Sequence, residues 1–515
     1  MGELRAHDRP GIVAAMAQEP LDLLIVGGGI TGAGLALEAA SRGLRTGLIE
    51  RRDFASGTSS RSSKMVHGGL RYLATGDIAL VREALHERAH LQVNAAHLVH
   101  PLPMVLPLYK ENSWVWRPKL GAGLLAYDLL GAWKAGGRHR WLRPQAAVER
   151  IPNLRPSGLK GAYAYADAQA DDVRLVMAVL RSAVAAGALV TNGVAATGLL
   201  RDGDTVQGVA ISADFTTPVR EIEARVVINA TGVWSDKLAQ HSGGPAIDVM
   251  PSKGVHLTVP RSSAGIESCL GMFAYTGRNV FIEPWDEDLA IVGTTDAPFD
   301  GDLTDPRATE SDITELLTTV NAVLATPIDR RDVLSAWAGL RPLVVDRNAQ
   351  ASRTSDVSRK HKLFQSPGLM TLVGGKLTTF RAMAEEAVDA VCKQLGTHRP
   401  STTRHLQLIG ADLPMSSDAI RELQAAGCDE RLARHLLRRY GSEARHIMHM
   451  CATDPDLRDP IHTDRPYIAA EVAFAAQYEM AACVDDVLWR RTRLSLEVAD
   501  TAPVVTTVNS ILESA

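Results

Sequence analysis

The hydrophobic pattern near the start of the chain predicts a strand, a glycine-rich turn, a helix and a second strand. Residues 21–26, LDLLIV, are a short apolar run of the length of a buried strand. This run leads directly into GGGITGAG, the helical stretch LALEAASRG follows, and RTGLIE predicts a second strand that ends at Glu50. That order of elements is typical of a parallel α/β unit.

Three later stretches predict more elements of this kind, and the last part of the chain differs from them. Residues 170–192 predict an amphipathic helix followed by a strand, and residues 224–232 predict a buried strand that ends in an Ala-Thr-Gly turn. Residues 368–380 predict a strand, a Gly-Gly turn and a helix. From about residue 395 onward the pattern is helical with almost no strand signal, so we expect a separate helical domain there.

The composition is that of a soluble globular protein. The chain has 515 residues, enough for about three domains of roughly 150 residues each. Hydrophobic residues at 46% and charged residues at 22% exclude disordered and coiled-coil classes. Lys and Arg number 55 against 59 Asp and Glu, for a net charge of −4. Because nucleic-acid binders are usually strongly basic, no nucleic-acid partner is expected.

Cysteine usage and hydropathy indicate the cellular compartment. The 5 cysteines form no CxxC pair, which fits a reducing compartment and makes structural zinc an unfavourable hypothesis. The N-terminal segment lacks the apolar core of a signal peptide, and no apolar run reaches the length of a membrane span. These features predict a cytoplasmic protein without a membrane span.

The first glycine-rich turn has the spacing of a dinucleotide-binding fingerprint. Gly27, Gly29 and Gly32 stand in GxGxxG register between the predicted strand and helix. Such glycines allow the backbone to approach a pyrophosphate, which the helix N-terminus then faces. Glu50 can accept hydrogen bonds from a ribose and would repel a 2′-phosphate, so NADP is disfavoured. These features alone leave NAD and FAD open.

Longer sequence motifs, which we call words below, begin in the following segment and distinguish these two cofactors. GTSSRSSKMVHGGLRYL follows Glu50, and INATGVW, SKGVHL, IVGTTD, AGLRPL and LVGGKLTTFRAMAEEAVDA follow later in the chain. Together with GGGITGAG, these words closely resemble those of the FAD-dependent glycerol-3-phosphate dehydrogenases, the quinone-linked flavoproteins of aerobic glycerol metabolism. The resemblance covers residues from about 20 to 390.

This resemblance implies an α/β fold in three parts. A Rossmann-like FAD-binding domain would be discontinuous, over residues 18–75, 166–233 and 341–392. An inserted mixed-sheet substrate domain would take residues 76–165 and 234–340, and the helical C-terminal domain would take residues 395–515. The implied FAD-binding residues are Gly27, Gly29, Gly32, Glu50, Thr58, Ser59, Ser60, Ser63, Val194, Ala230, Gly232, Gly374, Gly375, Lys376, Leu377 and Thr378.

Oxidation of an alcohol by FAD needs a substrate anchor, a base for the hydroxyl proton and stabilisation of the reduced flavin's negative charge. Arg71, Arg341 and Lys376 resemble the family's substrate-pocket cations, and arginine suits a phosphate because its fork binds bidentately. His256 is the predicted base, since an ordinary pKa near 6.5 leaves a neutral imidazole near neutral pH. Tyr72 is predicted to orient the substrate.

The sequence leaves alternatives open for the general base and for the function. Lys253 and the arginines could also touch the substrate. The resemblance implies oxidation of sn-glycerol 3-phosphate to dihydroxyacetone phosphate, by hydride transfer to flavin N5 and electron transfer to a quinone. A glycerophosphate oxidase that uses oxygen is one alternative, and an amine- or amino-acid-oxidase-like flavoprotein is another. The non-enzymatic alternative is a flavin-holding sensor or interaction protein that has lost turnover. The oligomeric state stays open, and a homo-oligomer is one option.

Two shorter motifs suggest other chemistry, and both are weak. The GGK of Gly374 to Lys376 lacks the other residues of a phosphate-binding Walker loop. His86, Glu87 and His90 spell the zinc-protease HExxH, but the third histidine of its extended form is out of register. We therefore predict no metal site.

The segment from residue 113 to 143 indicates contact with a membrane surface. It contains four of the 8 tryptophans, and its six basic side chains stand against Asp128 alone. Basic side chains attract anionic lipid, and tryptophans enter the interface. Since a quinone dissolves in the bilayer, we expect peripheral association with the inner face of the cell membrane. Arg138, Arg140 and Arg143 are the basic residues whose replacement is expected to weaken it.

Overall fold

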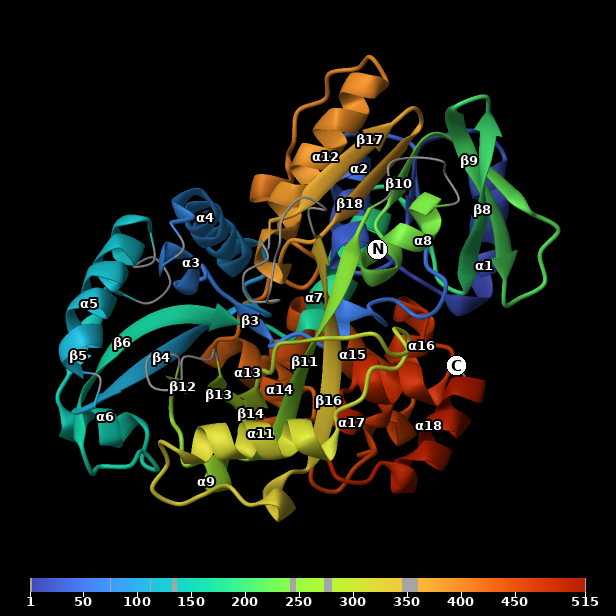
Figure 1. Cartoon of the computed structure of the whole chain (residues 1–515). Helices are drawn as coiled ribbons and strands as arrows, with labels where there is room; N and C mark the ends of the chain where they lie inside the picture. The colour runs from blue at the N-terminus through green and yellow to red at the C-terminus, as the bar shows by residue number, and fades with distance from the viewer. Residues whose placement is uncertain are drawn as a thin grey trace.

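Two sheets and a cluster of helices make up the protein in this computed structural model, shown in Figure 1. The structure describes residues 2–74, 76–111, 113–131, 137–240, 247–272, 280–344 and 360–514. The predicted α/β class, with a mixed sheet and a helical C-terminal part, is confirmed.

The first sheet has a parallel centre in the strand order β17-β18-β10-β1-β2-β7. An antiparallel hairpin of β8 and β9 extends β10, and β17 pairs antiparallel with β18. The strands are β1 (Leu21–Val26), β2 (Thr46–Ile49), β7 (Leu189–Thr191), β8 (Val194–Asp202), β9 (Thr205–Ala213), β10 (Glu221–Asn229), β17 (Lys362–Ser366) and β18 (Leu369–Val373). These strands come from the three segments predicted to share the FAD-binding domain.

Three helices pack around this parallel centre: α2 (Ile30–Ser41), α7 (Asp172–Ala185) and α12 (Phe380–Gln394). The strands β1 and β2 are buried almost throughout, as parallel strands with covered faces must be. Apolar side chains of α2, α7 and α12 share one core cluster with them.

The second sheet is mixed and has the order β15-β11-β14-β13-β12-β4-β6-β3, with β16 on β11 and β5 on β6. Its strands are β3 (Met65–Val66), β4 (His100–Tyr109), β5 (Arg140–Leu142), β6 (Leu159–Gln169), β11 (Val249–Pro260), β12 (Cys269–Gly271), β13 (Phe281–Trp285), β14 (Leu289–Gly293), β15 (Ala297–Pro298) and β16 (Ser335–Val344). Helix α11 (Glu310–Asn321) contributes its apolar face to the core of this sheet. Strand β3 joins this second sheet, although it lies in a segment predicted for the first.

The other helices lie outside the two sheets. Helices α4 (Ile78–Asn94) and α5 (Ser113–Leu129) are at the left of Figure 1. The C-terminal helices, red in Figure 1, are α13 (Ser417–Ala425), α14 (Glu430–Tyr440), α15 (Ala444–Thr453), α16 (Ala469–Glu479), η11 (Asp486–Arg491), α17 (Leu494–Glu497) and α18 (Ala502–Ser514). The shorter helices include α1 (Arg9–Ala17), η2 (Thr58–Ser60), α3 (Arg71–Ala74), α6 (Pro144–Arg150), α8 (Ser235–Gln240), α9 (Arg261–Ala264) and η7 (Leu377–Thr379).

Candidate active site

A cavity of about 300 Å³ lies at the carboxyl ends of β1, β10 and β18, where an open α/β sheet usually binds its ligand. We call it the dinucleotide cavity. The predicted residues that line it are Gly27, Gly29, Glu50, Thr58, Ser59, Val194, Ala230, Gly232, Gly374, Gly375, Lys376 and Leu377. Three separate segments of the first sheet therefore meet at one cavity.

Glycines bring the backbone to the wall of this cavity at several points. Gly27 has a φ of +116°, and a Cβ atom there would lie 2.6 Å from the carbonyl oxygen of Ala230. A Cβ atom on Gly32 would lie 1.8 Å from the carbonyl oxygen of Gly27, so this glycine packs the helix α2 against the turn. Gly374 and Gly375 both have a φ of +83°. Only glycine fits these positions without strain.

The carboxylate of Glu50 is fixed at the cavity by backbone N–H groups. Gly28 N donates to Oε2 at 2.7 Å, and Arg52 N donates to Oε1 at 2.9 Å. Burial raises the pKa of this carboxyl, and the two backbone hydrogen bonds oppose that rise. Ser59 Oγ accepts a hydrogen bond of 2.9 Å from Ile30 N, in the first turn of α2. The predicted ribose and pyrophosphate contacts therefore lie at the strand end and the helix start.

A second cavity, of about 510 Å³, adjoins the first and shares residues 374–377 with it. We call it the adjoining cavity. The predicted residues that line it are Thr58, Ser63, Tyr72, His256, Arg341, Gly374, Gly375, Lys376, Leu377 and Thr378. The structure thus brings the predicted base and two of the predicted cations to the border of the dinucleotide cavity.

His256 is buried on β11 between two neighbouring strands. Its Nε2 lies 2.8 Å from Ser63 Oγ, and its ring stacks on Trp337 of β16 with centroids 5.4 Å apart. A Cβ atom on Gly293 of β14 would lie 2.2 Å from His256 Cδ2, so this glycine makes room for the ring. Burial lowers the pKa of His256 well below its ordinary value, and the charges of Arg341 and Lys64 lower it further. The imidazole is therefore neutral at neutral pH.

The predicted cations lie beside the histidine. Arg341 Nη1 donates to the carbonyl oxygen of Thr295 at 3.2 Å and Nη2 donates to Thr294 Oγ1 at 3.0 Å. Its guanidinium also lies 3.7 Å from Asp296 Oδ1. Lys376 Nζ lies 3.9 Å from the ring centroid of Tyr72. The cations are thus oriented by polar and aromatic neighbours within the cavity.

Three predicted or alternative residues do not line these cavities. Gly32 packs behind the glycine turn and lines neither cavity, and Ser60 is buried with its carbonyl oxygen accepting from Lys64 Nζ. The side chain of Arg71 lies outside the described residues. Lys253, the alternative base, forms an ion pair of 2.7 Å with Asp312 on α11 and does not line the adjoining cavity.

Sequence reasoning missed several side chains that line the adjoining cavity. Arg61 donates to the carbonyl oxygens of Pro306 and Ala338 at 3.2 and 3.3 Å, and burial lowers the pKa of its guanidinium. The signal for Arg61 was its place inside the motif GTSSRSSK, among the predicted hydroxyl residues Thr58, Ser59, Ser60 and Ser63. Asp167 was missed because its buried partner Arg88, at 2.5 Å, is 79 residues away.

The HExxH spelling has a structural explanation. Glu87 accepts hydrogen bonds of 2.8 and 2.5 Å from Arg381 of α12, so its carboxylate joins α4 to α12. Within the described ranges, no group of His, Cys, Asp and Glu could hold a metal ion. All five cysteines are free thiols.

Two protein families match this chain, one over the residues that contain both cavities and one over the C-terminal helices. The FAD dependent oxidoreductase family matches residues 22–390, and the C-terminal domain of alpha-glycerophosphate oxidase matches residues 401–514. Glycerol-3-phosphate dehydrogenase 2 of Mycobacterium bovis is 42% identical over 491 residues, which cover 94% of this chain and 82% of that protein. The chain belongs to the FAD-dependent glycerol-3-phosphate dehydrogenase family.

Other glycerol-3-phosphate dehydrogenases extend this result. The mitochondrial enzyme of Mus musculus is 37% identical over 92% of this chain and 67% of its own length. The crystal structure of the Bacillus halodurans enzyme, complexed with FAD, has a TM-score of 0.80 and 30% identity, and it covers 100% of this chain and 95% of that chain. The cofactor of the family is FAD, and the glycine-built dinucleotide cavity fits it. Gly27, Glu50 and Gly374 are residues of this chain that would hold it.

Proposed function

We propose that this protein oxidises sn-glycerol 3-phosphate to dihydroxyacetone phosphate with FAD and passes the electrons to a membrane quinone. One observation carries the proposal: a cavity lined by a neutral histidine and two cations shares wall residues 374–377 with the dinucleotide cavity. The substrate named by the relatives has both groups that such a cavity suits, a phosphate dianion and a secondary alcohol.

Each side chain then has a distinct role. Arg341 binds the phosphate, because its guanidinium lines the adjoining cavity, is oriented by two threonine oxygens and has the planar fork that suits a phosphate. His256 accepts the C2 hydroxyl proton, and Lys376 adds positive charge at the border of the two cavities. When bound, FAD supplies the two-electron acceptor, with flavin N5 as the site that receives the C2 hydride.

Anaerobic mixing tests the substrate. Flavin absorbance should bleach with glycerol 3-phosphate and should stay unchanged with glycine, sarcosine or glycerol. Glycine and sarcosine are the matched controls for an amino-acid-oxidase-like site, and glycerol lacks only the phosphate. Bleaching by glycine or sarcosine, or by glycerol to the same extent, would contradict the proposal.

The electron acceptor needs its own experiment, because the oxidase alternative shares the first half of the reaction. The reduced protein should be reoxidised rapidly by a soluble quinone analogue and slowly by air-saturated buffer. Fast reoxidation by oxygen with formation of hydrogen peroxide would favour the oxidase alternative and would leave the substrate assignment intact.

The exposed face of α5 supports delivery of electrons at a membrane surface. Trp114, Leu125 and Leu129 are 79%, 55% and 80% exposed, and their spacing places them on one side of the helix. Cations cover two more rings nearby, Lys119 over Trp116 and Arg117 over Trp141. Trp133 and Lys134, also counted in the predicted membrane segment, lie outside the described residues. Among the described residues, no helix has the length and apolar character needed to cross a bilayer.

Vesicle binding tests this surface. The protein should co-sediment with anionic vesicles, and much of it should be released by high salt. Replacing Trp114, Leu125 and Leu129 by Ser, or Arg138, Arg140 and Arg143 by Glu, should reduce turnover with a membrane quinone and spare turnover with a soluble dye. Equal binding to neutral vesicles, or equal loss of both activities, would contradict the placement.

A further inference from the structure

The C-terminal helical domain reaches the loop that carries Ser63. Arg493 is buried at the start of α17, with a φ of +74°. Its Nη1 donates to the carbonyl oxygen of Ser60 at 3.2 Å, and its Nη2 lies 3.3 Å from Asp172 Oδ1. Arg493 belongs to the segment matched by the C-terminal family, whereas Ser60 and Asp172 belong to the segment matched by the oxidoreductase family. One side chain therefore contacts the reaction-site loop from another domain.

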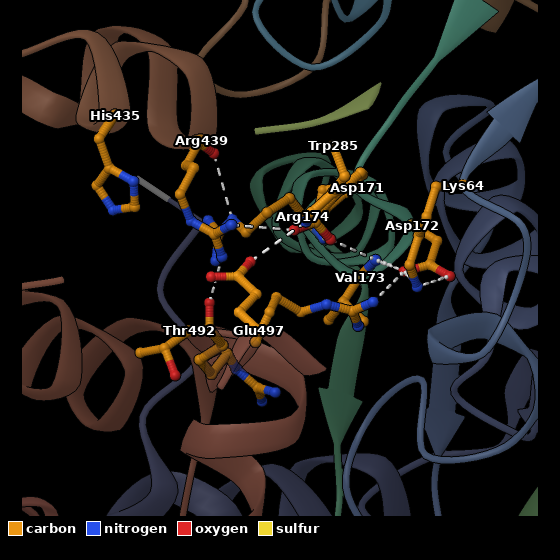
Figure 2. Close-up of polar contacts among 12 residues, drawn as sticks. Lys64, Asp171, Asp172, Val173, Arg174, Trp285, His435, Arg439, Thr492 and Glu497 are labelled. Atoms are coloured by element: carbon orange, nitrogen blue, oxygen red, sulfur yellow. Dashed lines mark hydrogen bonds and ion pairs between the residues drawn. The ribbon is translucent and has the colours of Figure 1, made fainter. Parts of the chain in front are cut away.

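Asp172 in turn holds the loop on both sides of Ser63. Ser62 donates to Asp172 Oδ2 from its backbone nitrogen at 3.1 Å and from its hydroxyl at 2.7 Å. Lys64 donates to both oxygens of Asp172, at 2.8 and 2.7 Å, and Figure 2 shows these two side chains pointing toward each other. The backbone that carries Ser63 can therefore shift away from His256 only if one of these buried contacts breaks.

The contacts involve buried charges, which makes the arrangement sensitive to the loss of any one of them. Lys64, Asp172 and Arg493 are all wholly or almost wholly buried. Burial lowers the pKa of Lys64 to about 8. The positive charge of Arg493 also lowers this pKa, and the negative charge of Asp172 raises it. Removing one partner from a buried ionic cluster leaves uncompensated charge and forces the others to rearrange.

We infer that Arg493 is a positioning residue for the reaction: it fixes Asp172 and the loop 60–64, and thereby holds Ser63 against His256. When Ser63 Oγ accepts from Nε2–H, the lone pair stays on Nδ1, for which the described residues provide no hydrogen-bond partner. The C-terminal domain would thus set which ring nitrogen accepts the proton. This inference rests on the proposed role of His256.

Hydrogen exchange and flavin reduction together test it, with Arg493→Gln compared against Arg181→Gln. Arg181 is the matched control because it also is buried and joins the same two domains, through Glu443, without contacting the loop. In Arg493→Gln, amides of residues 58–64 should exchange faster, and the rate of flavin reduction at saturating substrate should fall about ten- to a hundredfold. FAD occupancy and the KM for substrate should change less than about twofold.

The rate and the amplitude of flavin bleaching separate positioning from general damage. Misfolded molecules lower the amplitude, whereas a displaced Ser63 lowers the rate in the molecules that hold FAD. The control should show neither faster exchange in the loop nor a lower rate. A normal rate in Arg493→Gln, or an equal loss of rate in Arg181→Gln, would overturn the inference.

Two further variants keep the test decisive if Arg493→Gln folds poorly. Arg493→Lys keeps the charge and should recover part of the rate. Two charges face His256, those of Lys64 and of Arg341 on β16. The residues against its ring, Trp337 and Gly293, are uncharged. Lys64→Met removes one of the two charges. The pKa of His256 should then rise, and the acid limb of flavin reduction should move to higher pH.

An unchanged pH profile in Lys64→Met together with no recovery in Arg493→Lys would overturn the inference. Failure of the proposed function gives a different result, because the unmodified protein would then show no bleaching by glycerol 3-phosphate. Faster loop exchange in Arg493→Gln would still be measurable in that case.

Discussion

The two adjoining cavities differ in the groups that they present to a ligand. The dinucleotide cavity is lined by backbone at Gly27, Gly29 and Gly232, whereas the adjoining cavity presents the charged or ionisable side chains of Arg341 and His256 among others. A backbone-built site recognises its ligand by close approach, so added volume should damage it. A site built from side chains acts through charge and hydrogen bonds, so changes of charge or reach should damage it. The predictions below test that distinction.

The largest effect is expected for His256→Ala. Loss of a general base usually slows a reaction by about 10²- to 10⁴-fold, and flavin reduction by glycerol 3-phosphate should slow by that factor. FAD content should stay near normal, because His256 lines only the adjoining cavity. Stopped-flow absorbance measures the rate, and an unaltered rate would exclude His256 as the base.

Gly27→Ala tests the backbone-built cavity. The new Cβ atom would lie 2.6 Å from the Ala230 carbonyl oxygen, at a φ of +116°. Strain and overpacking of together about 2 to 5 kcal/mol should weaken FAD binding by roughly thirtyfold or more. Gly232→Ala is the matched control, since its φ is also positive and open space surrounds it. Flavin fluorescence titration should show a clearly smaller loss for the control, and equal losses would mean that volume is not the cause.

Arg341→Lys tests the side-chain-built cavity without changing its charge. Lysine loses the planar fork, and a charge-assisted hydrogen bond contributes about 1.5 to 3 kcal/mol, so kcat/KM should fall about ten- to a hundredfold. FAD occupancy should be unaffected. Steady-state kinetics with a soluble dye measures the loss, and an unchanged kcat/KM would remove Arg341 from the phosphate site.

The pH dependence is a sharper test of the same cavity. Burial and neighbouring cations lower the pKa of His256, so its neutral form persists below pH 6.5 and flavin reduction should decline only at lower pH. Arg341→Gln removes one cation and should move this acid limb to higher pH. Stopped-flow rates from pH 5 to 8, with a non-histidine buffer series, measure the acid limb in the wild type and in the variant. A wild-type limb at or above 6.5 would contradict the geometry.

The smallest effect is expected for Lys253→Met. Lys253 pairs with Asp312 and lies outside the adjoining cavity, so kcat/KM should change by less than about twofold. A loss comparable to that of Arg341→Lys would place Lys253 in the substrate site after all.

The same distinction explains how far the sequence could be interpreted. Gly27, Glu50 and Gly374 stand in contiguous words because a strand, its turn and the next helix build the backbone-lined cavity locally. His256 and Arg341 were identified only through the resemblance of SKGVHL and AGLRPL to a known family. Their meeting depends on the register that places β11 beside β16. No local pattern encodes that register.

The contacts of Asp167 and Arg493 show where sequence reasoning stops. Asp167 pairs with Arg88 across two elements, and Arg493 reaches Asp172 from a different domain. Hydrophobic periodicity predicts that each helix or strand exists, but it does not predict which buried charge faces which other. The helical and strand segments were therefore easier to predict than the ionic contacts between them.

The position of Arg493, downstream of both sheets in chain order, has a consequence for biosynthesis. A ribosome makes the glycine turn and the Ser63 loop early, and domains generally fold in the order of their synthesis. The side chain that contacts Ser60 and Asp172 is made only after every strand of the first sheet. A nascent chain, or a product released early by a premature stop codon, could fold its first sheet and still lack a completed reaction site.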